Sequence, residues 1–201
     1  MTAITDSFGK YSRNYISKLG ICLSNDVLQK VEIMSNRILR AWEENSKVFI
    51  CGNGGSAANA MHIANDLFYG VGSYGSSRKI KGINVEALST NGAIITCLAN
   101  DVGYEHIFSN QIDVKGDADD VLIVLSGSGN SPNVLQAIQK AKSKRIETFA
   151  IVAFDGGKCK EQADHVIHVK INDMQIAEDS QLIIGHICMQ WLRLQDREGS
   201  E

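Results

Sequence analysis

A Gly/Ser-rich turn follows a buried apolar run in the middle of the chain, and this junction constrains the fold more than any other feature. Residues 121–125 read Val-Leu-Ile-Val-Leu, a continuous apolar run typical of a strand covered on both faces. The turn at 126–131 reads Ser-Gly-Ser-Gly-Asn-Ser, and Pro132 then suits the first position of a helix. A strand that passes through such a turn into a helix is the repeating unit of parallel α/β sheets.

A second junction of the same kind lies earlier in the chain. The β-branched and aromatic run at 47–51 ends in Gly-Asn-Gly-Gly-Ser at 52–56, and helix-forming residues follow at 57–67. Apolar spacing before this strand predicts two helices within 6–45, broken near 20–25, with Asn25 or Asp26 as the cap of the second. Further strands are predicted at 82–88, 148–153 and 165–169, and further helices at 92–100, 104–114, 132–144 and 176–195.

This alternation of strands and helices predicts an α/β fold. We expect a three-layer α-β-α sandwich with a central parallel sheet, preceded by N-terminal helices. Ligands of such sheets bind at the carboxyl ends of the strands, and both Gly/Ser turns lie at those ends. The two turns are therefore expected to form one shared site.

The chemistry of the two turns favours an anion. A helix N-terminus offers unpaired N–H groups and a partial positive charge, and serine hydroxyls add donors. Ser126, Ser128 and Ser131 thus have the composition of a phosphate cradle. Neither turn matches the P-loop or the dinucleotide fingerprint, which argues against ATP and NAD. Simple helix capping is the alternative, but two such junctions favour anion binding.

Composition narrows the class of protein. The 201 residues suit one domain, and a net charge of -3 leaves no electrostatic footprint for nucleic acid. No apolar stretch is long enough to cross a bilayer, and residues 1–10 do not resemble a signal peptide. The five cysteines are then expected to be reduced thiols in a cytoplasmic protein. Cys51 adjoins the first turn but has no activating partner nearby in sequence, so a nucleophilic role is not favoured.

Several blocks of the chain resemble one known family. Residues 51–58, Cys-Gly-Asn-Gly-Gly-Ser-Ala-Ala, followed by Met61-His62, are similar to the first signature of the sugar isomerase (SIS) domain in its phosphoheptose isomerase branch. Further blocks lie at 98–104, 126–134, 155–158 and 183–186, in the order that the family has them. Together the blocks span most of the chain and are specific to this branch.

The resemblance implies an enzyme. Members of this branch convert sedoheptulose 7-phosphate to D-glycero-D-manno-heptose 7-phosphate through an enediol, for bacterial lipopolysaccharide, capsule or glycoprotein. The family implies a zinc ion (Zn2+) and a homotetramer whose active sites lie at subunit interfaces. By this resemblance the chain is one SIS domain over 1–201, with oligomerisation helices at 1–45 and an α/β core with a C-terminal helix at 46–201.

The family's substrate-binding roles are carried over to matching positions. The phosphate is expected at the third block, at Ser126, Gly127, Ser128 and Ser131. The sugar is expected at the first block, at Asn53, Gly54 and Ser56. Asp101 stands where the family has a polar active-site residue.

A metal and acid–base set is also expected. His62 and Asp66 are four residues apart on a predicted helix and so share one face, which suits a zinc pair. The resemblance adds His186, with Glu178 eight residues before it, as the remaining ligands. It also implies that Asp66 or Glu178 is one acid–base group and His186 the other.

The sequence departs from the family at four places. Asp66 stands where the family has Glu, Glu178 where it has Gln, and Gln175 where it has Asp. The loop at 68–81 does not resemble the usual sequence, so the exact sugar stays open.

Two other functions remain open at this point. One is isomerisation of a different ketose phosphate by the same chemistry. The other is a non-catalytic SIS protein that binds a partner, as replication-initiator-associating members do. A sugar-phosphate-sensing regulator is less favoured because no DNA-binding helix pair is attached. The retention of His62 and His186 favours an enzyme over a binding protein.

Overall fold

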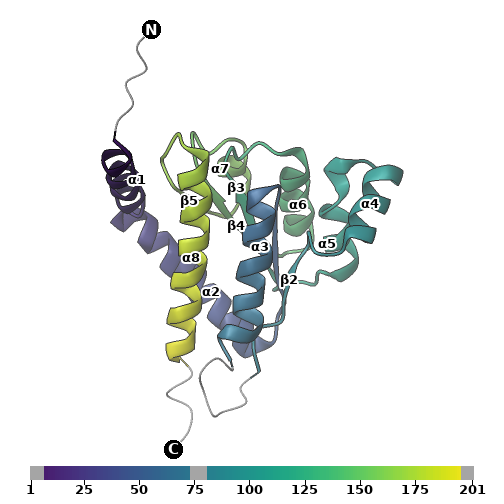
Figure 1. The fold of residues 1–201 in the computed structure, drawn as a ribbon. Coiled ribbons are helices and arrows are strands. Elements are labelled where there is room, and N and C mark those ends of the chain that lie inside the picture. The colour runs from purple at the N-terminus through teal and green to yellow at the C-terminus, as the bar shows by residue number, and fades with distance from the viewer. Residues whose placement is uncertain (1–6, 73–80, 196–201) are drawn as a thin grey trace, which may run out of the picture.

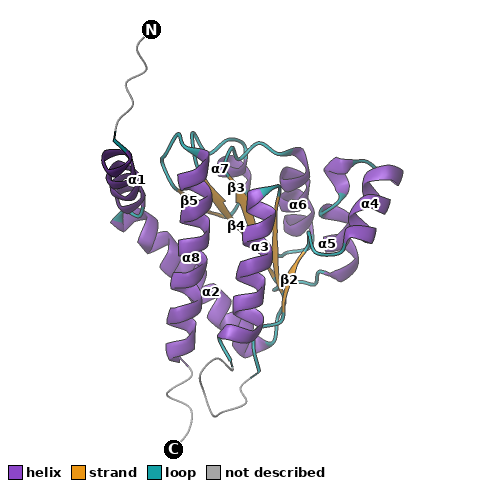
Figure 2. Cartoon of the chain, viewed as in Figure 1, coloured by secondary structure: helices purple, strands orange, loops and turns teal. Residues whose placement is uncertain are grey.

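A computed structural model describes residues 7–72 and 81–195 of the protein (Figures 1 and 2). The helices are α1 (Phe8–Cys22), α2 (Asn25–Glu44), α3 (Gly55–Asn65), α4 (Gly92–Asp101), α5 (Ser109–Lys115), α6 (Pro132–Ser143), α7 (Cys159–Gln162) and α8 (Met174–Gln195), with a π-helical turn at Asp66–Gly70 and a 3-10 turn at Tyr104–His106. The strands are β1 (Val48–Gly52), β2 (Val85–Ala87), β3 (Val121–Ser126), β4 (Glu147–Val152) and β5 (His165–His168). Of the loop at 68–81, residues 73–80 lie outside the described residues.

The five strands form one parallel sheet in the order β2-β1-β3-β4-β5. This is the flavodoxin-like order, and it confirms the predicted α/β fold with a central parallel sheet. The chain leaves β1 toward β2 on one side and continues from β3 toward β4 on the other. The strand order therefore reverses between β1 and β3, which is where such folds open a binding crevice.

Helices cover both faces of the sheet, which completes the three predicted layers (Figure 1). Val48 and Ile50 of β1 pack into one core with α2, α3 and α8. Phe49 and Cys51 point the other way into a second core with α5 and α6. All five residues of β1 are buried, as expected for a strand covered on both faces.

The structure corrects the local prediction at three places. Ser24, rather than Asn25 or Asp26, caps α2, and its hydroxyl accepts from the Val27 N–H. The helix predicted at 104–114 is broken into a 3-10 turn and α5, because Ile107 and Phe108 turn inward and are each 1% exposed. The short helix α7 was not predicted.

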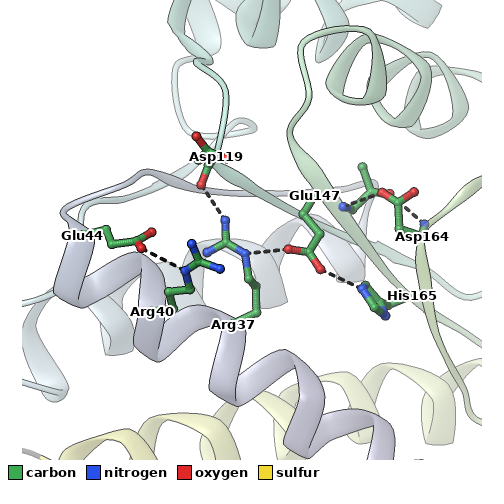
Figure 3. Close-up of polar contacts among 8 residues, drawn as sticks. Arg37, Arg40, Glu44, Asp119, Glu147, Asp164 and His165 are labelled. Atoms are coloured by element: carbon green, nitrogen blue, oxygen red, sulfur yellow. Dashed lines mark hydrogen bonds and ion pairs between the residues drawn. The ribbon is translucent and has the colours of Figure 1, made fainter.

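A polar network ties α2 to the amino edge of the sheet (Figure 3). Arg37 of α2 donates to Glu147 at the start of β4 (2.6 Å) and to the Asp119 carbonyl. Glu147 also pairs with His165 of β5, at 2.7 Å. This edge lies opposite the Gly/Ser turns, so the network anchors the scaffold and stays clear of the carboxyl edge. Among the described residues no helix is long and apolar enough to cross a membrane.

Candidate functional site

A cavity of about 280 Å³ opens at the carboxyl ends of β1 and β3, at the point where the strand order reverses. Three segments line it: the turn after β1, the turn after β3, and the first part of α8. The lining residues are Asn53, Gly54, Gly55, Ser56, Leu125, Ser126, Gly127, Ser128, Ser131, Met174 and Glu178. The structure therefore brings both predicted turns into one cavity.

The serine turn presents hydroxyl groups to this cavity. Ser126 Oγ accepts from the Gly129 N–H at 3.1 Å, and Ser128 Oγ accepts from the Asn130 N–H at 3.3 Å. Since each oxygen is the acceptor in these bonds, each hydroxyl keeps its own proton for a ligand. Ser131 is the N-cap of α6, but its side chain makes no capping bond. Three hydroxyl donors thus face the cavity at a helix N-terminus, where an anion is favoured.

The serine turn is held by a neighbouring loop. Gly129 has φ +65°, and a Cβ there would lie 2.0 Å from the Gly156 carbonyl oxygen, so only glycine fits. Asn130 Oδ1 accepts from the Lys158 N–H at 3.0 Å. The block at 155–158 therefore braces the serine turn from outside and does not line the cavity.

A second group of polar residues lies further along α3 and α8. His62 Nε2 and His186 Nε2 are 3.0 Å apart, and Asp66 Oδ2 is 3.4 Å from each of them. His62 lies in the last turn of α3, and Asp66 begins the π-helical turn that follows. His186 comes from α8, which packs beside α3 (Figure 1). Two helices far apart in sequence thus bring one carboxylate and two imidazoles together.

The spacing of these three atoms suits a zinc ion. Zinc–nitrogen distances of 2.0–2.1 Å in a tetrahedron put neighbouring ligand atoms about 3.3 Å apart. The observed separations are 3.0, 3.4 and 3.4 Å. Imidazole and carboxylate groups are also the ligand types that zinc prefers. The three side chains could therefore hold one divalent ion without rearrangement.

Glu178 does not join this cluster. It lies two helical turns earlier on α8, about 12 Å along the axis from His186. Its carboxylate instead lies against the start of α3, where a Cβ on Gly55 would come within 2.4 Å of both oxygens. The Glu178 backbone carbonyl accepts from Asn59 Nδ2 at 2.9 Å. Its carboxylate makes no hydrogen bond or ion pair with the other residues that the structure describes. The expected set of four ligands is thus divided between the cluster and the cavity.

Asp101 is not brought to the cavity. It is exposed at the end of α4, where its oxygens accept from Asn100 Nδ2 (2.7 Å) and Cys97 Sγ (3.5 Å). Helix α4 stands at the opposite side of the molecule from α8 (Figure 1). Within one chain, Asp101 is therefore separate from the residues that line the cavity.

Cys51 is not suited to nucleophilic chemistry. It is fully buried in β1, and burial raises the pKa of its thiol far above the ordinary value. All five cysteines are free, and only Cys97 is exposed.

Met174 is a lining residue that the sequence analysis missed. The last helix was predicted from 176, but α8 begins at Met174. Asp173 Oδ1 accepts from the Ile176 N–H at 3.3 Å, which is the bond of a helix cap. An aspartate just before the apolar run was the signal for the earlier start.

The chain is similar to proteins of one family. Residues 13–153 match the SIS domain family. A phosphoheptose isomerase from Sulfurimonas denitrificans is 37% identical over 175 residues, which cover 87% of each chain. One from Helicobacter pylori (strain P12) is 39% identical over 150 residues, covering 75% of this chain and 76% of the relative.

A solved structure agrees with these sequence relatives. The phosphoheptose isomerase from Neisseria gonorrhoeae superimposes with a TM-score of 0.82 at 26% identity, covering 92% of this chain and 95% of that one. The family match, the relatives and the shared fold agree with one another. The chain belongs to the SIS domain family and, within it, to the phosphoheptose isomerases.

Proposed function

We propose that this protein isomerises sedoheptulose 7-phosphate to D-glycero-D-manno-heptose 7-phosphate. The observation that carries the proposal is one cavity lined by Ser126, Ser128, Ser131 and Glu178, together with a cluster of two imidazoles and a carboxylate at His186, two helical turns further along α8 than Glu178. The first feature suits a phosphate and the second suits proton transfer. The names of the curated relatives support the same reaction.

The rise along α8 from Glu178, which lines the cavity, to His186 is comparable with the length of the substrate. An extended seven-carbon chain advances roughly 1.2 Å per bond, so its C1 lies about 10 Å from the phosphorus. Glu178, beside the serine turn, and His186 are about 12 Å apart along α8. We place the phosphate at Ser126, Ser128 and Ser131 and C1 and C2 toward the cluster. Glu178 then faces the phosphate and the neighbouring hydroxyls.

This placement assigns the proton transfers to Asp66 and His186. The C1–H bond breaks and its proton passes to the Asp66 carboxylate, while the C2 carbonyl oxygen gains a proton to give the enediol. The O1 proton then leaves, and C2 receives one, so the aldose forms with no net gain or loss of atoms. Asp66 Oδ2 faces the two imidazoles, whereas Oδ1 contacts Asn65 Nδ2 only at 3.5 Å and is open to the substrate. His186 is the second acid–base group, acting through Nδ1, because its Nε2 faces His62 and Asp66 in the cluster.

His62, Asp66 and His186 would hold a zinc ion, which supplies a positive charge that polarises the substrate carbonyl. Imidazole nitrogens and a carboxylate oxygen are ligand types that zinc prefers.

A homotetramer with sites shared between subunits is part of the proposal. Helix α1 exposes Phe8 (84%), Ile16 (66%) and Ile21 (73%) to solvent, a large apolar surface for a single copy. The division into oligomerisation helices at 1–45 and a core at 46–201 follows from this use of α1 and α2. Cytoplasmic localisation, for a pathway of bacterial heptose synthesis, suits five cysteines outside any disulfide.

The deciding experiment is isomerisation of sedoheptulose 7-phosphate by the purified protein, before and after chelation and again after zinc is restored. We expect turnover that falls with the chelator and returns with zinc. In deuterium oxide the product should carry deuterium at C2, because an enediol is protonated there from solvent. No turnover by the zinc-loaded protein would reject the heptose assignment, and a panel of other ketose phosphates would then test the first alternative. If the protein turns over none of the ketose phosphates in the panel, the alternative of a non-catalytic binding protein remains.

A further inference from the structure

The side chain of Asn53 in the cavity wall is held by a reciprocal amide pair with Asn133. Asn53 Nδ2 donates to Asn133 Oδ1 at 2.9 Å, and Asn133 Nδ2 donates to Asn53 Oδ1 at 2.8 Å. The two residues follow different strands and are 80 positions apart in sequence. Two bonds between two planar groups fix both the position and the rotation of the Asn53 amide.

The backbone of α6 sets the direction of this pair. Asn133 Oδ1 also accepts from the Val134 N–H at 3.0 Å. A backbone N–H can only donate, so it fixes which end of the Asn133 amide is the oxygen. That assignment in turn forces Asn53 to present its nitrogen to Asn133 Oδ1. Asn133 is only 1% exposed, so water does not compete for these bonds.

Tyr104 completes the arrangement from a third segment. Its hydroxyl donates to Asn53 Oδ1 at 3.0 Å. The Asn53 oxygen thus has two donors, and one of its two N–H groups is taken by Asn133. The other N–H has no acceptor among the described residues, and Asn53 lines the cavity. One donor of fixed direction is therefore left for a ligand.

We infer that Asn133 and Tyr104 are positioning residues that orient the free N–H of Asn53 toward a sugar hydroxyl. Neither Asn133 nor Tyr104 lines the cavity, so each acts through Asn53. The ligand group is a hydroxyl or carbonyl oxygen of the bound sugar phosphate, because a phosphate is already served by the serine turn. This inference rests on the proposed isomerase function.

A double-mutant cycle tests whether Asn133 acts through Asn53. Asn133→Leu keeps the shape of the buried side chain and removes both amide bonds to Asn53. We expect it to lower kcat/KM for sedoheptulose 7-phosphate on the order of tenfold. Asn53→Ala should lower kcat/KM by a similar factor, and the double variant should be no worse than Asn53→Ala alone, because a residue that acts only through Asn53 has nothing left to position. Losses that multiply in the double variant would overturn the inference.

Two further variants separate positioning from a purely structural role. Gln111→Leu removes another buried amide, which bonds to the Leu88 and Ile107 carbonyls, and should lower stability but not kcat/KM. Tyr104→Phe removes only one exposed hydroxyl and should fold normally. It should lower kcat/KM about two- to threefold in the wild-type background and have no effect in the Asn53→Ala background. An equal effect of Tyr104→Phe in both backgrounds would overturn its part of the inference.

Binding of inorganic phosphate provides the last control. The serine turn holds phosphate without Asn53, so Asn133→Leu should leave the phosphate Kd unchanged. An equal loss of phosphate affinity would mean that Asn133 merely supports the start of α6, and the inference would fail. If the wild-type protein does not turn over sedoheptulose 7-phosphate, the proposed function fails, and the same cycle is measured on the Kd of that sugar phosphate.

Discussion

His62 Nε2 and His186 Nε2 lie 3.0 Å apart although 124 positions separate the two residues in sequence. Asp66 is equally close to both nitrogens, and both imidazole rings remain partly open to solvent. Two imidazole nitrogens this close can share either one proton or one metal ion. The carboxylate of Asp66 beside them fits the metal that we propose.

Replacement of either histidine should therefore remove the metal. We expect His62→Ala or His186→Ala to abolish stoichiometric zinc binding, measured by elemental analysis of the dialysed protein, and to lower kcat at least 100-fold. His106→Ala is the matched control, since His106 lies on an exposed 3-10 turn and its nearest carboxylate, on Glu105, is 3.9 Å away. Full zinc content in both cluster variants would show that this cluster is not the metal site.

The two carboxylates should respond in opposite ways to replacement by their amides. Asp66→Asn removes the proposed base and a ligand, so turnover should be lost. Glu178→Gln removes a negative charge beside the phosphate cradle, so KM should fall several-fold while kcat stays within about threefold of wild type. Steady-state kinetics of both purified variants make the test. If the Glu178→Gln variant were inactive and the Asp66→Asn variant active, Glu178 rather than Asp66 would be the base.

The strands and the serine turn were predictable because they depend on local pattern. The run at 121–125 is apolar on both faces, and β3 occupies 121–126. The pairing of His62 with Asp66 followed from a spacing of four within one helix. These features need no knowledge of the rest of the fold.

The features that were not predicted depend on contacts between distant segments. The helix expected at 104–114 breaks because the core takes up Ile107 and Phe108, and periodicity alone does not show this. The resemblance paired Glu178 with His186 as ligands although eight helical residues span about 12 Å, and the structure groups His62, Asp66 and His186 without Glu178. The Asn53–Asn133 pair joins the turn after β1 to the first turn of α6, and the pairing of β1 with β3 brings these two segments together.

The ion pairs of Arg37 and Arg40 should differ in their effect on stability. Glu147→Ala leaves the Arg37 guanidinium, whose side chain is 11% exposed, without its carboxylate and should lower the free energy of unfolding by about 2–3 kcal/mol. Glu44→Ala is the matched control, because the Arg40–Glu44 pair in Figure 3 is exposed to solvent and should contribute far less to stability. Urea denaturation at neutral pH measures both. Equal losses would mean that the Arg37 network does not anchor α2.

The bond between Tyr15 of α1 and Asp179 of α8 should disappear at high pH. Tyr15 donates to Asp179 Oδ2 at 2.6 Å, and this bond, with burial and the charge of Asp179, raises the pKa of Tyr15 to about 12. Because the folded pKa is above the ordinary value of 10, the contribution to stability is complete below pH 10 and is lost as pH rises through about 12. Tyrosinate absorbance should show one late-titrating tyrosine, and Tyr15→Phe should remove it. If the Tyr15→Phe variant still shows a tyrosine that titrates at high pH, the raised pKa belongs to another tyrosine.

Asp101 should be required by the active site of a neighbouring subunit. Within one chain it is exposed on α4 and does not line the cavity, although its position matches a polar active-site residue of the family. We expect Asp101→Asn and His186→Ala each to be nearly inactive as pure proteins. After the two variants are unfolded and refolded together, the tetramers that we propose would contain some sites with both native residues, so activity should return. Ile16→Asp in both partners should break the α1 contacts and prevent this recovery, with size-exclusion chromatography as the check on assembly. If mixed assemblies of native size recover no activity, Asp101 and His186 belong to the site of the same subunit.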